Sequence, residues 1–244
     1  MILALDSSTH ALSLALARWE GSTLHPVLAR EVDDGGQHGH SLPAAIEGIL
    51  REAGATLDSL AGCAVGLGPG SFTGLRVGMA TLKGLCYARK IPLAGVSSLR
   101  ALALGAAGRA APDELLCALL DARRGELYGG LFRGGDAEPL GPERALPPQR
   151  LAGWLDELGV AKVRLFGEGL WAQRAALEAA ARSGLILDFD GPRAPAALDV
   201  ARLAGPPGDV RPEALFALEP RYVRPSEAEL KHPEGTFKPH PSAG

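Results

Sequence analysis

The feature that most constrains the fold is a similarity between two segments that lie 115 residues apart. The first, LALDSSTHALSLALAR, places Asp6 between two apolar segments, and the second, LLDARRGELYGGLFR, places Asp121 in the same way. At this shift Leu5 coincides with Leu120, Leu12 with Leu127, Leu16 with Leu131, and Arg18 with Arg133. Each segment reads as strand, Asp-bearing turn and strand. Either two hairpins resemble each other by chance, or the chain contains a duplication, which implies two similar α/β lobes.

Apolar periodicity along the rest of the chain alternates between helix and strand. Helical spacing covers 42–53, 74–90, 98 onward, 170–182 and 195–204, and short apolar runs at 62–67, 92–96 and 162–166 indicate strands. The segment 108–114, GRAAPDE, has the Gly, Pro and charge of a connection. We therefore predict an α/β fold with an N-terminal lobe at 1–110 and a C-terminal lobe at 111–224. The proline-containing residues 225–244, poor in large apolar side chains, are expected to be disordered.

Composition argues against several classes of function. A net charge of −3 and 5% aromatic residues leave neither a broad basic surface nor a base-stacking platform, so any RNA is expected to be held by another subunit. Gly, Pro or charge interrupts every apolar run before the roughly 20 residues of a membrane helix. No basic segment precedes the first apolar residues, so a cytoplasmic protein is expected. The scattered Cys63, Cys86 and Cys117 read as buried reduced thiols.

Two Asp-bearing hairpins that open duplicated lobes resemble the actin-like ATPase superfamily, which includes sugar kinases and heat-shock ATPases. In that superfamily the tight turn after a strand aims backbone N–H groups and a short polar side chain at nucleotide phosphates. Asp6 with Ser7, and Asp121 in the second lobe, are the residues expected to form such vestigial phosphate loops. The alternative is that each Asp only stabilises a turn at the end of its strand.

A glycine-rich segment, GPGSFTGLR, links a strand to a helix and contains Gly70, Ser71, Thr73 and Gly74. Ser71 or Thr73 is placed to cap the helix, and free N–H groups there favour an anion. It is not a Walker loop, because no Lys follows the last glycine. The alternative is a tight turn that lets the helix pack close to the sheet. The histidine pair at 38 and 40 is spaced i, i+2 in a glycine-rich segment, so no metal site is expected.

Six segments together resemble the TsaB (YeaZ) family: ALDSS, HSLPAAI, GLGPGSFTGLRVGMATLKGL, PLAGVSSLRAL, LDARRGELY and PRYVR. The resemblance covers residues 1–224, and PGSFTGLRVG is its most specific part. It implies a degenerate relative of TsaD, the subunit that transfers threonylcarbamoyl to the adenosine next to the tRNA anticodon, which gives threonylcarbamoyladenosine (t6A).

The resemblance also implies that the catalytic metal site of TsaD is missing. TsaD carries a histidine pair spaced i, i+4 where this chain has Ser98 and Leu102, and Pro195 is nearest to the position of a further carboxylate ligand. A leucine offers no lone pair, and a single hydroxyl is a poor ligand for a transition metal. We therefore expect a non-catalytic accessory subunit, even where relatives are described as peptidases. No cofactor is expected on the isolated chain, while a nucleotide at a subunit or lobe interface stays open.

The partners that the resemblance implies are TsaD, in a heterodimer, and the ATPase TsaE. A homodimer is expected when TsaD is missing, and tRNA is reached only indirectly through the complex. The rival hypothesis is an ATP-dependent phosphotransferase that uses Asp6, Asp121 and the loop 68–74.

The predicted helix at 74–90 carries a row of small residues, Ala80, Gly84 and Ala88, at i, i+4 and i+8, with Val77 beside it. Small residues in such a row let two helix backbones approach closely. In TsaB proteins the first two helices contact TsaD, so we expect these residues to form the partner interface. The alternative is that the row packs against the helix of the same chain at 41–54.

Overall fold

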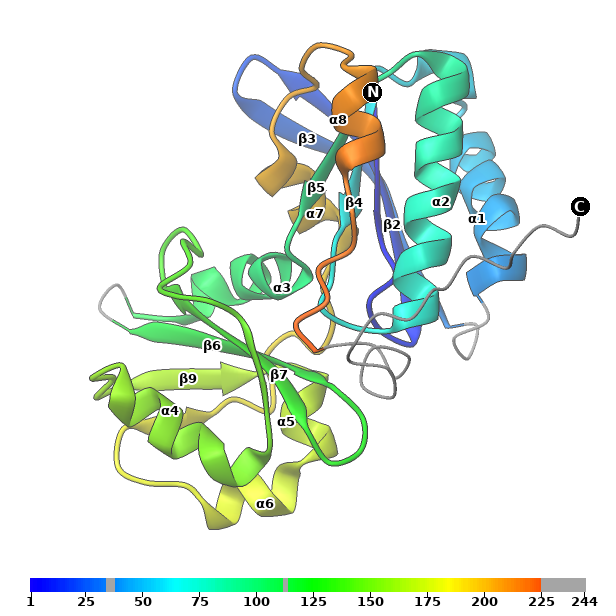
Figure 1. Cartoon of the computed structure of the whole chain (residues 1–244). Helices are drawn as coiled ribbons and strands as arrows, with labels where there is room; N and C mark the ends of the chain where they lie inside the picture. The colour runs from blue at the N-terminus through cyan, green and yellow to red at the C-terminus, as the bar shows by residue number, and fades with distance from the viewer. Residues whose placement is uncertain (34–37, 112–113, 225–244) are drawn as a thin grey trace, which may run out of the picture.

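The computed structural model describes residues 1–33, 38–111 and 114–224, without the side chains of 38–40 and 212. Two five-stranded sheets form the framework (Figure 1). The first sheet contains β1 (Ile2–Asp6), β2 (Ala11–Glu20), β3 (Thr23–Asp33), β4 (Gly62–Gly66) and β5 (Leu93–Val96). The second sheet contains β6 (Leu115–Asp121), β7 (Leu127–Arg133), β8 (Arg144–Leu146), β9 (Val163–Phe166) and β10 (Leu185–Leu187).

The two sheets have the same topology. The first has the strand order β3-β2-β1-β4-β5, with β1, β2 and β3 antiparallel and β4 and β5 parallel to β1. The second has the order β8-β7-β6-β9-β10 with the same pattern of parallel and antiparallel pairs. The first and sixth strands therefore correspond, and each ends on its aspartate, Asp6 or Asp121. The α/β class and the duplication are confirmed.

Helices cover both faces of each sheet. They are α1 (His38–Glu52), α2 (Phe72–Arg89), α3 (Ser98–Ala106), α4 (Leu151–Glu157), α5 (Glu168–Ala172), α6 (Arg174–Ala179), α7 (Ala197–Ala204) and α8 (Pro212–Ala217). The single helix expected at 170–182 is wrong, because the helical hydrogen bonding breaks at Gln173, which adopts a non-helical φ of −116°. The helix expected from Ser41 instead begins at His38.

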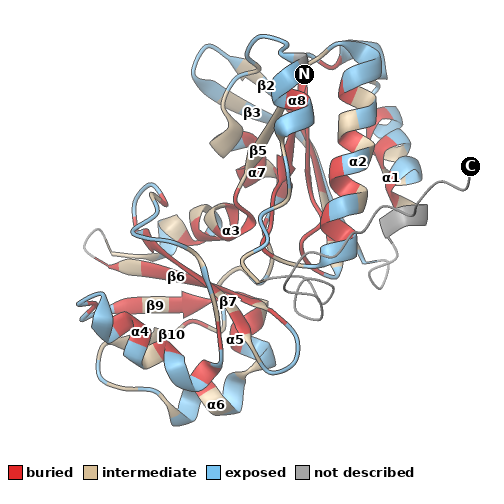
Figure 2. Ribbon diagram, viewed as in Figure 1, coloured by how far each residue is buried: buried red, intermediate tan, exposed pale blue. Residues whose placement is uncertain are grey.

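The period of two in β1 explains the first core. Leu3 and Leu5 point to one side, where they pack with apolar residues of α1 and α2. Ile2 and Ala4 point to the other side and pack against α7, with Ala101 of α3. Both helical layers are well buried toward the sheet (Figure 2).

The second core divides in the same way. Leu119 of β6 packs with α4, α5 and α6, while Leu116 and Leu120 of the same strand pack with α3. Helix α3 thus follows the first sheet in sequence and covers the inner face of the second. All three cysteines are buried and free, as expected.

After the second sheet the chain returns to the first. Helix α7 contacts β1, β2 and β4, and α8 contacts α2. The division into lobes at 1–110 and 111–224 stays a prediction. The return of the chain means that a helix from beyond residue 190 also packs on the first sheet. The expected disorder at 225–244 lies outside the described residues. None of the helices in the described part of the chain has the length and apolar character to cross a bilayer.

Candidate functional site between the two aspartate turns

A pocket of about 420 Å³ opens between the two lobes, where the aspartate turns face each other. The first lobe contributes the end of the β1–β2 turn and the start of α2, and the second contributes the β6–β7 turn and Glu168. Its lining residues are Ser8, Thr9, His10, Gly70, Ser71, Phe72, Thr73, Asp121, Ala122, Arg123, Tyr128, Glu168 and Arg224. The fold therefore brings most of the sequence-predicted phosphate-loop residues to one cleft, but Asp6, Ser7 and Gly74 lie behind it.

Asp6 is 1% exposed and its carboxylate is used inside the protein. One oxygen, Oδ1, accepts hydrogen bonds from the backbone N–H of Ser8 at 2.9 Å and from its hydroxyl at 2.6 Å. The other, Oδ2, accepts from the hydroxyl of Ser98 at 2.6 Å. A carboxylate with both oxygens engaged and no exposure has little capacity left for a metal ion or a phosphate-bound water. The phosphotransferase hypothesis therefore does not fit this residue.

Ser7 and the neighbouring glycines favour close packing. The Ser7 hydroxyl is fully buried and donates to the carbonyl of Gly74 at 2.9 Å. A Cβ at Gly70 would overlap Ser8, one at Gly66 would overlap the carboxylate of Asp6, and one at Gly78 would overlap Ser7. These glycines are needed so that β4 and α2 can approach the first turn. The alternative that the glycine-rich segment serves tight packing thus has direct structural support.

The beginning of α2 remains open to the pocket. Ser71 caps the helix, and its hydroxyl accepts from the N–H of Gly74 at 3.2 Å. The N–H of Ser71 itself donates to the carbonyl of Ser8 at 2.7 Å. Ser71 and Thr73 are exposed, so this end of the helix is accessible to a small anion.

The second turn differs from the first in being exposed and charged. Asp121 accepts from the N–H of Arg123 at 2.9 Å, and the Arg123 guanidinium contacts His10 across the cleft. Arg123 and Arg124 have φ values of 61° and 55°, so two consecutive arginines adopt the left-handed conformation that normally favours glycine. This strained turn carries Arg123 to the mouth of the pocket.

Glu168 is one of the pocket residues that the sequence analysis did not predict. It opens α5, directly after β9, and its N–H donates to the carbonyl of Arg193 at 2.7 Å. Burial, and after it the charge of Asp121, raises the pKa of Glu168 to about 7. A Gly-Glu-Gly turn after a predicted strand was visible in the sequence, but nothing in it indicated that parallel pairing of β6 and β9 places Glu168 beside Asp121.

The positions compared with metal ligands are fully occupied by structural contacts. The Ser98 hydroxyl is buried, donates to Asp6 and accepts from the N–H of Gly68 at 3.0 Å. Leu102 is buried in the core beneath α3, and Pro195 is buried just before α7. Among residues 1–33, 38–111 and 114–224 no cluster of three His, Cys, Asp or Glu side chains could hold a metal ion. The side chains of residues 38 and 40 are not among those described.

The predicted partner interface is placed on the surface. Ala80, Gly84 and Ala88 are exposed and Val77 is half-buried. A Cβ added at Gly84 would have no atom within 4 Å. Helices α1 and α2 do contact each other, but through the flank of α2 that carries Leu85 and Thr81. The small-residue row, defined here as Ala80, Gly84 and Ala88, is therefore not covered by α1.

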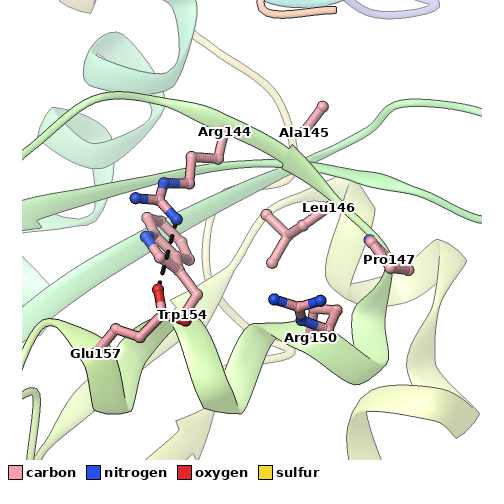
Figure 3. Close-up of a pocket in the computed structure, with 7 residues that line it drawn as sticks. All are labelled: Arg144, Ala145, Leu146, Pro147, Arg150, Trp154 and Glu157. Carbon is pink, nitrogen blue, oxygen red and sulfur yellow. Dashed lines mark ion pairs between the residues drawn. The ribbon is translucent and has the colours of Figure 1, made fainter.

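A smaller pocket, of about 250 Å³, lies between β8 and α4 (Figure 3). Arg144 lies over the Trp154 ring at 5.9 Å and pairs with Glu157 at 3.7 Å. The arginine charge is thus compensated locally, and the tryptophan is 4% exposed. These contacts form a packed cluster at the surface, and they do not indicate a binding or catalytic site.

Two lobes with one strand order, meeting at paired aspartate turns, define the duplicated actin-like ATPase fold. A family model described as TsaD, tRNA N6-adenosine threonylcarbamoyltransferase, matches residues 33–190, more than half of the chain. The chain belongs to this wider family and, within it, to the TsaB (YeaZ) proteins.

The individual relatives agree with this assignment. The tRNA threonylcarbamoyladenosine biosynthesis protein TsaB of Escherichia coli is 34% identical over 148 residues, 56% of this chain and 60% of that protein. The Bacillus subtilis protein of the same name is 35% identical over 161 residues, 64% and 65% of the two chains. These matches span less than two thirds of either relative. The structure of YeaZ from Pseudomonas aeruginosa is similar over 91% of this chain and 98% of its own, with 30% identity and a TM-score of 0.69.

A further Pseudomonas aeruginosa structure is described as an uncharacterized protein with similarity to peptidase YEAZ. It matches 91% of this chain and 99% of its own, with 30% identity and a TM-score of 0.71. In the cleft, the hydroxyl of Ser8 donates to Asp6 at 2.6 Å and the His10 ring contacts Arg123.

Proposed function

We propose that this chain is a non-catalytic partner subunit of the machinery that forms t6A in tRNA. In this proposal it binds TsaD and supports the transfer of threonylcarbamoyl to the adenosine next to the anticodon. TsaE acts in the same system, tRNA is contacted through the complex, and the system works in the cytoplasm. A homodimer replaces the heterodimer when TsaD is missing. The names of the relatives from Escherichia coli and Bacillus subtilis support the pathway.

The observation that carries the non-catalytic role is the bonding of Ser98. This residue stands where TsaD is expected to hold a metal ligand, and its hydroxyl already links Asp6 to Gly68. Leu102, one helical turn later, contributes to the core instead. A transferase that needs a bound metal ion has no donor set at this place.

The binding role is supported by the exposure of the small-residue row. Gly84 has open space where a side chain would stand, so a partner helix can approach the α2 backbone closely. A helix with an apolar, uncovered stripe on a surface is typical of a protein interface. The residues proposed for this contact are Val77, Ala80, Gly84 and Ala88.

Reconstitution with purified components tests the proposal. The chain alone is expected to transfer no threonylcarbamoyl to tRNA, whereas its addition to TsaD and TsaE raises product formation. Transfer by the chain alone, at a rate comparable to that of the assembled system, contradicts the non-catalytic role. Titration calorimetry of the isolated chain with ATP and Mg²⁺ tests the rival phosphotransferase, which must bind nucleotide without a partner.

A further inference from the structure

Exposed aromatic side chains gather where α2 meets α8. Phe72 and Tyr87 on α2 are 41% and 65% exposed, and Phe216 and Tyr222, on and after α8, are 61% and 43% exposed. The rings meet in pairs, Phe72 with Tyr222 at 5.3 Å and Tyr87 with Phe216 at 5.7 Å between centroids. Aromatic residues concentrated on one exposed surface are characteristic of protein interfaces.

Three cations run along the same edge of α2 at heptad spacing. Arg76 donates to the hydroxyl of Tyr222 at 3.1 Å and lies 4.0 Å over the Phe72 ring, and Lys83 donates to the carbonyl of Phe216 at 3.1 Å. Lys90 ends the helix in the left-handed conformation and is exposed. The partners of Arg76 and Lys83 are neutral, and α2 contains no Asp or Glu, so their positive charge is not cancelled by these contacts.

We define the α2/α8 face by these residues: Phe72, Arg76, Lys83 and Tyr87 of α2, Lys90 at its C-cap, and Phe216 and Tyr222. Much of α8 and the outer side of α2 are exposed in Figure 2. The face borders the small-residue row directly, because Lys83 and Tyr87 follow Ala80 and Gly84 by three residues and therefore share a helix side with them. A partner helix seated on the row must pass beside these cations and rings.

An apolar pocket of about 740 Å³ lies at the C-terminal end of the face. Tyr87, Ala88 and Ile91 line one wall, and Val210 and Leu215 line the other. Ala88 belongs to the small-residue row, so the pocket continues the predicted partner interface. Val210 is 47% exposed, which leaves an apolar wall open to an inserted side chain.

We infer that the α2/α8 face binds an acidic helical segment of the protein partner, whose carboxylates meet Arg76, Lys83 and Lys90 and whose apolar anchor enters this pocket. The inference rests on the proposed function and names the chemistry of that contact. Arg76 and Lys83, whose hydrogen-bond partners are neutral, lie beside a mainly apolar pocket that Lys90 shares with Asp209. This combination favours a segment that joins carboxylates with a large apolar side chain.

The same cations also suit RNA, but two features favour protein. The rings pack against each other and Arg76 covers Phe72, so their faces are not arranged for bases to stack in succession. The pocket is apolar rather than polar.

The test compares the affinity for purified TsaD of two variants. One reverses a charge on the α2/α8 face, and the other makes the same reversal elsewhere on the surface. Lys90→Glu is expected to weaken binding at least about fivefold at low salt, and less at high salt, because exposed charges are screened. Lys162→Glu, an exposed lysine of the second lobe, is the matched control and leaves the affinity unchanged. Lys83→Gln, which keeps a donor for Phe216, weakens binding in the same direction.

The apolar part is tested by Phe216→Ala and Tyr87→Ala, each expected to weaken TsaD binding, against Leu140→Ala as an exposed control on the second lobe. Unchanged affinity in Lys90→Glu and Phe216→Ala, with weaker binding in Gly84→Leu, overturns the inference and leaves the proposed function standing. Unchanged affinity in all of them, or no binding of the wild-type chain to TsaD, removes the proposed docking itself. Loss of tRNA binding in Lys90→Glu with unchanged TsaD affinity also overturns the inference, in favour of RNA.

Discussion

The two lobes share one sheet topology but differ in their helical layers. In the first lobe α1 and α2 are 15 and 18 residues long, whereas in the second α4, α5 and α6 have 7, 5 and 6 residues. The short helices are sufficient to cover their sheet, as the burial of Trp154 and Leu170 shows. Helix α2 buries residues from Gly74 to Cys86 on one side, and its other side carries the exposed row and the α2/α8 face. Duplication preserved the sheet, and the helices diverged to leave on α2 the exposed surface that we propose for binding.

The aspartate turns show a second difference. Asp6 is 1% exposed and fixed by three hydrogen bonds, whereas the side chain of Asp121 is 19% exposed and pairs with the flexible Arg123 side chain. The first turn has become part of the core. The second still faces the cleft.

Substitution of these two residues should give the largest effect. Asp6→Ala leaves the N–H of Ser8 and the hydroxyl of Ser98 without their acceptor in a buried site, which should cost about 3 kcal/mol of stability. Asp121→Ala removes a partly exposed contact and should cost about 1 kcal/mol or less. Chemical denaturation of both variants measures the difference. Equal losses of stability would mean that the two aspartates contribute equally to folding.

The helical layers of the two lobes are compared by replacing one exposed glycine with leucine in each layer. Gly84→Leu should weaken TsaD binding by at least about tenfold, roughly 1.4 kcal/mol, because it fills the row that the partner helix approaches. Gly153→Leu in α4 meets no atom within 4 Å either, and it should leave the affinity unchanged. Far-UV circular dichroism should be native for both. Equal affinities in two folded variants would place the interface elsewhere, and unfolding of Gly84→Leu would show that the row packs within the chain.

The cleft should give a smaller, pH-dependent effect. Because the pKa of Glu168 is raised from 4.5 to about 7, the folded chain keeps this proton while the unfolded chain loses it. The stability from the protonated carboxyl is therefore complete below pH 4.5 and is lost as the pH rises through 7. Glu168→Gln stays neutral, so at pH 8 it should be more stable than wild type by roughly 1–2 kcal/mol, after allowance for partial exposure. Thermal melts from pH 5 to 8 measure this, and a constant difference would contradict it.

Removal of residues 226–244 should have the smallest effect. The sequence of this segment offers few large apolar residues for burial, so the melting temperature of the truncated chain should stay within about 2 °C of wild type. A fall of several degrees would show that the segment packs on one of the lobes.

Much of the first lobe could be predicted because its signals are local. The apolar run in ILALD and the repeated aspartate identified β1 and β6, and Ser71 was one of the two residues, with Thr73, expected to cap the helix. Helix α8 was missed because six residues are too few for a helical period, and its position depends on contacts with α2. Glu168 was missed as a cleft residue because strand pairing, which no local pattern encodes, brings it to Asp121. The exposure of Gly84 likewise depends on which flank of α2 meets α1.

The return of the chain to its first sheet has a consequence for biosynthesis. The face of β1 that carries Ile2 and Ala4 is covered by α7, about 190 residues later, and the N–H of Arg221 closes onto the carbonyl of Leu67. On a ribosome that releases residues in order, the first lobe therefore begins folding first and is finished last. During most of translation this apolar face stays open to chaperones and to other nascent chains. A ribosome-stalled chain ending before residue 197 should be captured by a chaperone holdase, whereas the full-length chain released from the ribosome should not be.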